Sequence, residues 1–267
     1  MVEAHGAAAA GGTGARVGAV GARAYLDALA PILAGVAAQA DGPVQDAAEL
    51  VVASLRAGGV VQAFGTGHSE ALAMELTGRA GGLVPTNRIS LRDLVVFGGD
   101  PPAVLDDEHL ERDPSVARRL YDLARPAAAD VFVIGSSSGV NGSVVELARL
   151  VKGRGHRLLA ITSFAHTAAV GSRHPSGTKL LDHADVALDN GAPYGDALLP
   201  LADGGSVCAV SSVTGVLLVQ LVGAEVVRRL LEAGEPPPVY RSANVPGGDD
   251  HNSAMEARYA GRIRRTA

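Results

Sequence analysis

Four short apolar runs, separated by longer stretches with helical periodicity, constrain the fold more than any other feature of this sequence. The runs are GVVQAF (59–64), DVFVIG (130–135), RLLAIT (157–162) and ADVALD (184–189). Helical patterns lie between several of them, notably at 115–124 and 143–155. Short buried strands that alternate with helices pack as a parallel sheet covered on both faces. The sequence therefore predicts an α/β fold, a three-layer sandwich around a doubly wound, mainly parallel sheet.

The two ends of the chain differ from this central region. Residues 1–22 are mostly Ala and Gly without apolar periodicity, so we expect a flexible tail there. Two helices are predicted before the first strand, and a long helix is predicted over about 207–233. The proline run at 236–238 then begins a C-terminal tail. Because no linker divides the chain, we expect residues 23–267 to form a single domain.

Charge and cysteine content limit the possible partners. The chain has 267 residues and a formal net charge of −5, and its Lys and Arg residues form no block that would bind nucleic acid or a membrane surface. Polar side chains interrupt the apolar stretch 207–227, which favours a core helix over a membrane span. The single cysteine, Cys208, excludes an internal disulfide and fits a cytoplasmic protein, and no signal peptide is evident. No Cys/His cluster has zinc-ligand spacing, so we expect neither a metal nor a cofactor.

Two unusual loops follow the first two predicted strands. The first, GTGHS (65–69), combines Gly65 and Gly67, which allow a close approach of the backbone to a ligand, with three polar side chains. The polar residues of this loop are Thr66, His68 and Ser69. The second loop, GSSSGVNGS (135–143), leads directly into a helix, so hydroxyl and N–H groups can converge there on one phosphate. Its candidate phosphate ligands are Ser136, Ser137, Ser138, Gly139 and Asn141.

Each loop also has a simpler interpretation. GTGHSE matches the dinucleotide pattern GxGxxG only in part, because Glu70 occupies the sixth position. Serine-rich turns often serve only as helix N-caps. Two such loops at the carboxyl ends of strands in one sheet nevertheless favour an anion-binding site, since ligands of open α/β sheets bind at that edge.

The order of these segments resembles the sugar isomerase (SIS) family of phosphosugar-binding domains over about residues 25–232. The resemblance rests on GTGHS, ELTGR (75–79), SSSGVN (136–141) and LLAITS (158–163). In that family the serine-rich loop, usually Ser-x-Ser-Gly-x-Thr, holds the sugar phosphate, which implies this role for Ser136, Ser137, Ser138 and Gly139. Asn141 stands where the threonine usually lies, and its amide can still donate a hydrogen bond.

Longer strings resemble a bacterial subgroup of uncharacterised phosphosugar-binding proteins with a single SIS domain. These strings are GHSEALAMELTGRAGG (67–82), SRHPSGTKLLDHADVALDNGAPYGDA (172–197) and RSANVPGGDDHN (241–252). Sites in this superfamily usually lie between subunits, so the resemblance implies a homo-oligomer, a dimer or a tetramer. A histidine near the chain end, often from a neighbouring subunit, completes such sites, which indicates His251 as a candidate.

Carboxylates and histidines are the candidates for proton transfer. ELTGR resembles the segment of phosphoheptose isomerases whose Glu is the catalytic base, which implies Glu75, with Glu70 as the alternative. Arg79 lies four residues after Glu75 and is expected either to hold a substrate oxygen or to form an ordinary salt bridge on the helix. His68 lies within the first loop, and a histidine there is suited to moving protons between sugar oxygens.

Two classes of function follow from these expectations. The first is an enzyme, an isomerase or a lyase that abstracts the C2 proton of a hexose or amino-sugar 6-phosphate. The alternative is a non-catalytic phosphosugar-binding sensor or regulatory module, although no helix-turn-helix segment accompanies the domain. A phosphoryl transferase is discounted because the sequence has no GxxxxGK[ST] loop.

Overall fold

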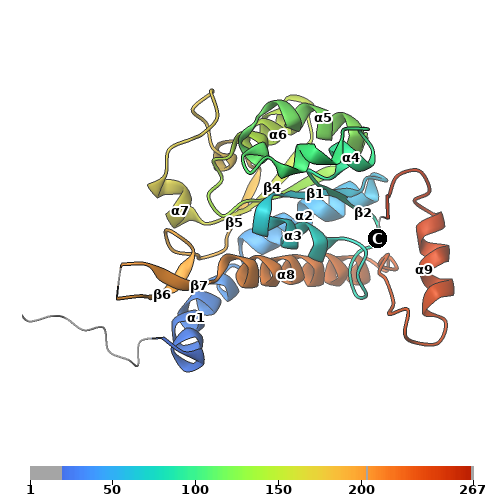
Figure 1. Cartoon of the computed structure of the whole chain (residues 1–267). Helices are drawn as coiled ribbons and strands as arrows, with labels where there is room; N and C mark the ends of the chain where they lie inside the picture. The colour runs from blue at the N-terminus through green and yellow to red at the C-terminus, as the bar shows by residue number, and fades with distance from the viewer. Residues whose placement is uncertain (1–19, 203, 266–267) are drawn as a thin grey trace, which may run out of the picture.

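A sheet of five parallel strands forms the centre of the computed structural model, which describes residues 20–202 and 204–265 (Figure 1). The strands are β1 (Val61–Gly65), β2 (Thr86–Ile89), β3 (Val131–Gly135), β4 (Arg157–Thr162) and β5 (Val186–Asp189). Their order across the sheet is β2-β1-β3-β4-β5, and every neighbouring pair is parallel. The predicted α/β fold with a mainly parallel sheet is thereby confirmed.

Helices cover both faces of the sheet because the strands are apolar on both sides. In β3, Val131 and Val133 belong to one buried cluster, whereas Phe132 and Ile134 belong to another. The helices of the first cluster are α2 (Pro43–Arg56), α3 (Glu70–Leu76) and α8 (Ser211–Glu232). Those of the second are α4 (Asp93–Val96), α5 (Ser115–Ala124) and α6 (Gly142–Gly153). Figure 1 shows α8 and α6 on opposite sides of the sheet, which gives the predicted three-layer sandwich.

An additional small layer lies beside the start of α8. It consists of α1 (Ala22–Ala37) and the antiparallel hairpin of β6 (Ala197–Pro200) and β7 (Ser206–Ala209). The helix expected over 207–233 was placed too early at its N-terminus, because residues 206–209 pair with β6 and α8 begins at Ser211. Residues 1–19 of the expected flexible tail lie outside the described residues, and its last residue, Ala22, begins α1.

The C-terminal segment, including α9 (Gly248–Ala257), covers the outer edge of β2. The side-chain amide of Asn87 in β2 donates to the Arg262 carbonyl oxygen at 2.6 Å, and its oxygen accepts from the Arg264 N–H at 2.7 Å. Arg262 also forms an ion pair of 2.6 Å with Asp130, the residue before β3. An uncovered edge strand is a template for aggregation. The segment therefore both protects the edge and holds the polar strand β2 in place.

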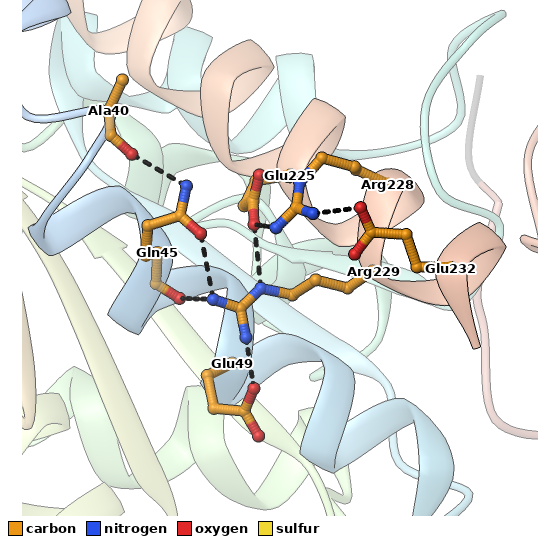
Figure 2. A network of polar contacts seen from close by, with 7 residues as sticks. All are labelled: Ala40, Gln45, Glu49, Glu225, Arg228, Arg229 and Glu232. Carbon is orange, nitrogen blue, oxygen red and sulfur yellow. Dashed lines mark hydrogen bonds and ion pairs between the residues drawn. The ribbon is translucent and has the colours of Figure 1, made fainter.

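A polar network joins the second half of α8 to α2 (Figure 2). Arg229 donates to the backbone and side-chain oxygens of Gln45, both at 3.1 Å, and pairs with Glu49 and Glu225. Hydrogen bonds from Arg228 and Arg229 lower the pKa of Glu225 to about 2. The network fixes α8 against α2. It thereby helps to hold the N-terminus of α8, at the other end of the helix, in position.

The remaining elements are short. They are α7 (Phe164–Ala169) and the 3₁₀ turns η1 (Gly67–Ser69), η2 (Pro102–Asp106), η3 (Leu110–Arg112) and η4 (Leu180–His183). Within the described parts of the chain, no helix has the length and apolar character that crossing a bilayer would require.

Candidate functional site

The two predicted loops begin side by side at the carboxyl edge of the sheet. Gly65 at the end of β1 is paired with Gly135 at the end of β3, so GTGHS and the serine loop (residues 136–139) start at the same level. A pocket lies between them, and its third wall is the N-terminus of α8. The lining residues are His68, Ser69, Leu72, Gly135, Ser136, Ser137, Ile161, Asn190, Ser211, Ser212 and Gly215.

Glycines give both loops their shape. A Cβ atom on Gly65 would lie 2.3 Å from the backbone oxygen of Ser69, so only glycine lets the first loop turn back this tightly. Gly139 has a φ of 65°, in the left-handed region that glycine favours. A Cβ there would lie 3.3 Å from the hydroxyl oxygens of Thr162 and Thr167. The loops are therefore held close to the strands, and their polar groups border the pocket.

The three serines of the second loop have different roles. The Oγ of Ser136 accepts a hydrogen bond of 3.1 Å from the N–H of Gly139, which closes the turn. The backbone oxygen of Ser137 accepts from the N–H of Ser163 at 3.1 Å, but its Oγ is buried without a hydrogen-bond partner. Buried polar atoms are nearly always paired, so this hydroxyl at the pocket is available to a ligand. Ser138 borders a different depression, on the other side of the loop.

Asn141 does not reach the pocket. Its side-chain nitrogen donates to Glu111 at 2.7 Å, and its oxygen accepts from Nη1 of Arg173 at 3.0 Å. Both halves of the amide are thus used within the protein, at the residue that precedes α6. The structure places the predicted phosphate ligand Asn141 in this bridge rather than among the lining residues.

The pocket is narrow as it stands. Its volume is about 20 Å³, compared with the roughly 10–15 Å³ that one water molecule requires. It has room for a water-sized group, such as one oxygen of a phosphate. The rest of a sugar phosphate would lie over the mouth, where His68 and Ser212 are exposed.

The other predicted residues of the first loop are divided between the pocket and its surroundings. His68 and Ser69 line the pocket. Thr66 is almost completely buried, and its backbone oxygen accepts from the N–H of Ser69 at 3.1 Å. Gly67 lies on the outer side, where the Oε2 of Glu111 is 3.6 Å from the position that a Cβ would take. Of this loop, His68 and Ser69 are therefore the side chains that a ligand in the pocket can contact.

The predicted catalytic carboxylate, Glu75, points away from the pocket. It forms an ion pair with Arg79 and accepts a hydrogen bond from Gln220 of α8, and all these contacts lie at a separate groove between α3 and α8. Arg79 is exposed and pairs with Glu75 four residues before it. This is the ordinary salt bridge on the helix that was one of its two expected roles. Within one chain, neither residue contributes to the pocket.

The alternative base, Glu70, is also engaged elsewhere. Its Oε1 accepts from the hydroxyl of Ser90 at 2.8 Å. Next to Ser90 lies Asp93, whose pKa is raised by burial although Arg264 opposes the shift. Glu70 therefore belongs to a polar cluster between α3 and α4 and not to the lining of the pocket.

His251 lies far from the pocket in the same chain. It belongs to α9, where its Nε2 is 3.0 Å from the carbonyl oxygen of Val239, a residue that follows α8. The pocket lies at the opposite end of α8, which has 22 residues and a length of about 33 Å. Figure 1 shows the same separation, with α9 at one end of α8 and the β6–β7 hairpin at the other.

Sequence reasoning missed the contribution of α8. Ser211, Ser212 and Gly215 line the pocket, although the polar residues of this segment were noted only as interruptions of an apolar stretch. A serine pair directly before a long apolar helix is a typical N-terminal signal. The carboxylate of Asp196 accepts from both the N–H and the hydroxyl of Ser211, at 2.8 and 2.6 Å, and thereby caps the helix. Asn190, after β5, completes the lining.

Hydrogen-bonding groups determine what the pocket can hold. Among residues 20–202 and 204–265, no three His, Cys, Asp or Glu side chains come together as metal ligands. The groups that surround the pocket are hydroxyls, backbone N–H groups, one amide and one imidazole. Such a set can bind an oxyanion by hydrogen bonds and can move a proton through His68.

Comparison with known proteins agrees with this architecture. The model of the SIS domain family matches residues 24–163, more than half of the chain. The chain therefore belongs to the SIS domain family. More narrowly, it is similar to UPF0309 protein lmo0025 of Listeria monocytogenes, with 40% identity over 82% of this chain and 89% of the relative. It is also 36% identical to UPF0309 protein BCAN_B0929 of Brucella canis, over 89% of this chain and 96% of that protein.

Solved structures support the same fold. A phosphoheptose isomerase from Francisella tularensis superimposes with a TM-score of 0.53 over 76% of this chain and 95% of its own. The sequence identity is 15%, so this likeness concerns the fold alone. The resemblance to the SIS family that the loops indicated is confirmed.

Proposed function

We propose that this protein binds a phosphosugar with its phosphate against the serine loop. The observation that carries the proposal is the Oγ of Ser137, buried without a partner where two loops and the start of α8 meet. Ser69, Ser136 and Ser212 line the same pocket, and their hydroxyls can add hydrogen bonds to the oxyanion. The phosphoheptose isomerase with the same fold supports a sugar phosphate as the ligand class.

The reaction that we propose is abstraction of the C2 proton of a hexose or amino-sugar 6-phosphate, followed by isomerisation or elimination. His68 is exposed at the mouth of the pocket, where the sugar would lie, and it can carry protons between sugar oxygens. Glu75 and His251 lie outside the pocket of their own chain, so they take part only if a second subunit brings them to it. The catalytic proposal for these two residues thus requires a homo-oligomer.

A binding module is the second candidate, and one observation favours it. The residues that line the pocket include no carboxylate, and Glu75 is held in contacts with Arg79 and Gln220. A pocket without a base would hold the phosphosugar without changing it, as in a sensor that reports the ligand to a partner.

Proton NMR in heavy water separates the two functions. The protein is incubated with N-acetylglucosamine 6-phosphate, glucosamine 6-phosphate and fructose 6-phosphate, and the signals of the protons next to the carbonyl carbon are followed, at C2 of the two amino sugars and at C1 of the ketose. Their loss establishes proton abstraction, and the product distinguishes an isomerase from a lyase. Persistence of all these protons alongside broadened ligand lines supports the binding module.

A pair of variants tests the phosphate position itself. Ser137→Ala should weaken binding of a sugar 6-phosphate by about 1 kcal/mol, or about fivefold. Ser253→Ala is the control, because it removes the same group from an exposed position of α9 that lines neither this pocket nor any depression of the serine loop. Equal affinity of Ser137→Ala and the wild type, measured by calorimetry, would show that the phosphate does not use this hydroxyl.

A further inference from the structure

The outer side of the serine loop forms a second and larger depression. Its lining residues are Ser138, Val140, His166, Val170, Gly171 and Arg173. The volume is about 390 Å³, within the range of pockets that bind small molecules. Ser137 borders the inner pocket and Ser138 the outer depression, so the loop is a wall shared by both.

Arg173 gives this depression a positive charge that the protein does not neutralise. Its Nη1 donates to the Asn141 side-chain oxygen at 3.0 Å, a neutral partner, and its backbone N–H donates to Val140 at 3.0 Å. In the part of the chain that the structure describes, no carboxylate lies within ion-pair distance of its guanidinium. The carboxylate of Glu111 contacts the far side of the same amide, at the Asn141 nitrogen.

The position of Arg173 is well defined even though the residue is exposed. Two hydrogen bonds, one from its side chain and one from its backbone, hold it beside the start of α6. A guanidinium has five N–H donors, so most of them stay available to a ligand after one bond to Asn141. Its planar fork matches two oxygens of a phosphate or a carboxylate.

His166 contributes a ring to the lining of the depression, and Tyr194 packs against this ring from outside the lining. The Nδ1 of His166 is buried without a hydrogen-bond partner, and its ring packs against Tyr194 with centroids 5.3 Å apart. Tyr194 is 68% exposed, which is unusual for a large aromatic side chain. The His166 ring in the lining is suited to the apolar face of a sugar that also carries an anionic group.

We propose that this outer depression is a second oxyanion site, in which Arg173 and the hydroxyl of Ser138 bind a phosphate or a carboxylate. The site differs from the inner pocket in every lining residue, so the inference does not rest on the proposed function. The oxyanion has two possible sources, the far end of a ligand that also occupies the inner pocket, or a separate small anion.

Calorimetric titration with inorganic phosphate tests the proposal. The wild type should bind two phosphates, and Arg173→Gln should lose one of them or bind it about tenfold more weakly. Arg241→Gln, an exposed arginine outside both pockets, is the matched control and should retain both. Unchanged binding of two phosphates by Arg173→Gln, or a single phosphate in the wild type that does not depend on Arg173, overturns the inference.

Arg173→Gln also removes a hydrogen bond to Asn141, so two further variants test the outer site independently. Arg173→Lys keeps the charge without the planar fork, and Ser138→Ala leaves Arg173 in place; each should weaken the outer site only. Ser137→Ala reports on the inner pocket in the same titration. If only Ser137→Ala loses phosphate binding, the result contradicts the outer site and supports the proposed function. If only Arg173→Gln loses phosphate binding, the result supports the outer site and contradicts the proposed function.

The source of the oxyanion follows from a comparison of fructose 6-phosphate with fructose 1,6-bisphosphate. If one ligand spans the loop, the bisphosphate binds at one equivalent, more tightly than the monophosphate, and Arg173→Gln removes the difference. If the anion is separate, both sugars bind alike and inorganic phosphate still titrates the outer site in their presence. If Arg173→Gln binds both sugar phosphates as the wild type does, neither result supports an outer site.

Discussion

Replacement of Gly65 by alanine should damage the fold and the pocket together. The new Cβ would lie 2.3 Å from the backbone oxygen and 2.7 Å from the backbone carbon of Ser69. Ordinary van der Waals contact begins at about 3.4 Å, so the first loop would have to move by about 1 Å. Both neighbours are backbone atoms, which cannot turn away as a side chain would. Overpacking of this kind costs about 1–3 kcal/mol of unfolding free energy.

Urea unfolding and phosphate titration measure the two consequences. Gly65→Ala should lower the free energy of unfolding by about 1–3 kcal/mol and weaken phosphate binding, because His68 and Ser69 shift with the loop. Gly35→Ala is the control, since a Cβ there meets nothing within 4 Å and helix propensity predicts a gain of about 0.5–1 kcal/mol. If Gly65→Ala unfolds and binds as the wild type does, the tight turn is not what shapes the pocket.

Three further predictions concern charged residues. Glu75→Gln should leave phosphate affinity in calorimetry unchanged, because Glu75 lies outside the pocket of its own chain; a tenfold loss would place it at the site. Asp130→Ala should destabilise the protein by about 3 kcal/mol in urea, because it removes the ion-pair partner of Arg262 and the acceptor of the Val60 N–H. A loss below about 0.5 kcal/mol would mark the pair as dispensable. The lowered pKa of Glu225, about 2, means that its stabilising effect is complete above pH 4.5 and disappears as the pH falls toward 2. The difference in melting temperature between wild type and Glu225→Gln should therefore shrink over this range, and a constant difference would contradict the assignment.

The sequence could predict the sheet because most of its strands are buried on both faces. Phe132 and Ile134 face one layer while Val131 and Val133 face the other, so the run is apolar throughout. The edge strand β2 was not predicted, because it lacks such an apolar run. Its residues Thr86–Ile89 include buried polar side chains whose partners, such as the C-terminal segment, are distant in sequence.

The loops of the site were predictable, but the direction of the helical side chains was not. The pairing of Gly65 with Gly135 confirms that both loops start at one edge of the sheet. On α3, the sequence offered Glu75 or Glu70 as the base, whereas the structure places Leu72 of this helix at the pocket and in the core. Leu72 takes this position because burying an aliphatic side chain stabilises the fold, whereas burying a carboxylate requires a partner.

The two sides of the serine loop differ in charge, and this difference decides how each responds to salt. No Asp, Glu, Lys or Arg side chain lines the inner pocket, and the N–H of Ser211 at the N-terminus of α8 already donates to Asp196. An anion is held there mainly by hydrogen bonds from neutral groups, whose strength depends little on ionic strength. The outer depression depends on the charge of the exposed Arg173, which salt screens at a Debye length of about 10 Å in 0.1 M solution. Raising the salt concentration from 0.05 to about 0.5 M should therefore weaken phosphate binding at the outer site more than at the inner one, and equal weakening would show that both sites depend on the same charge.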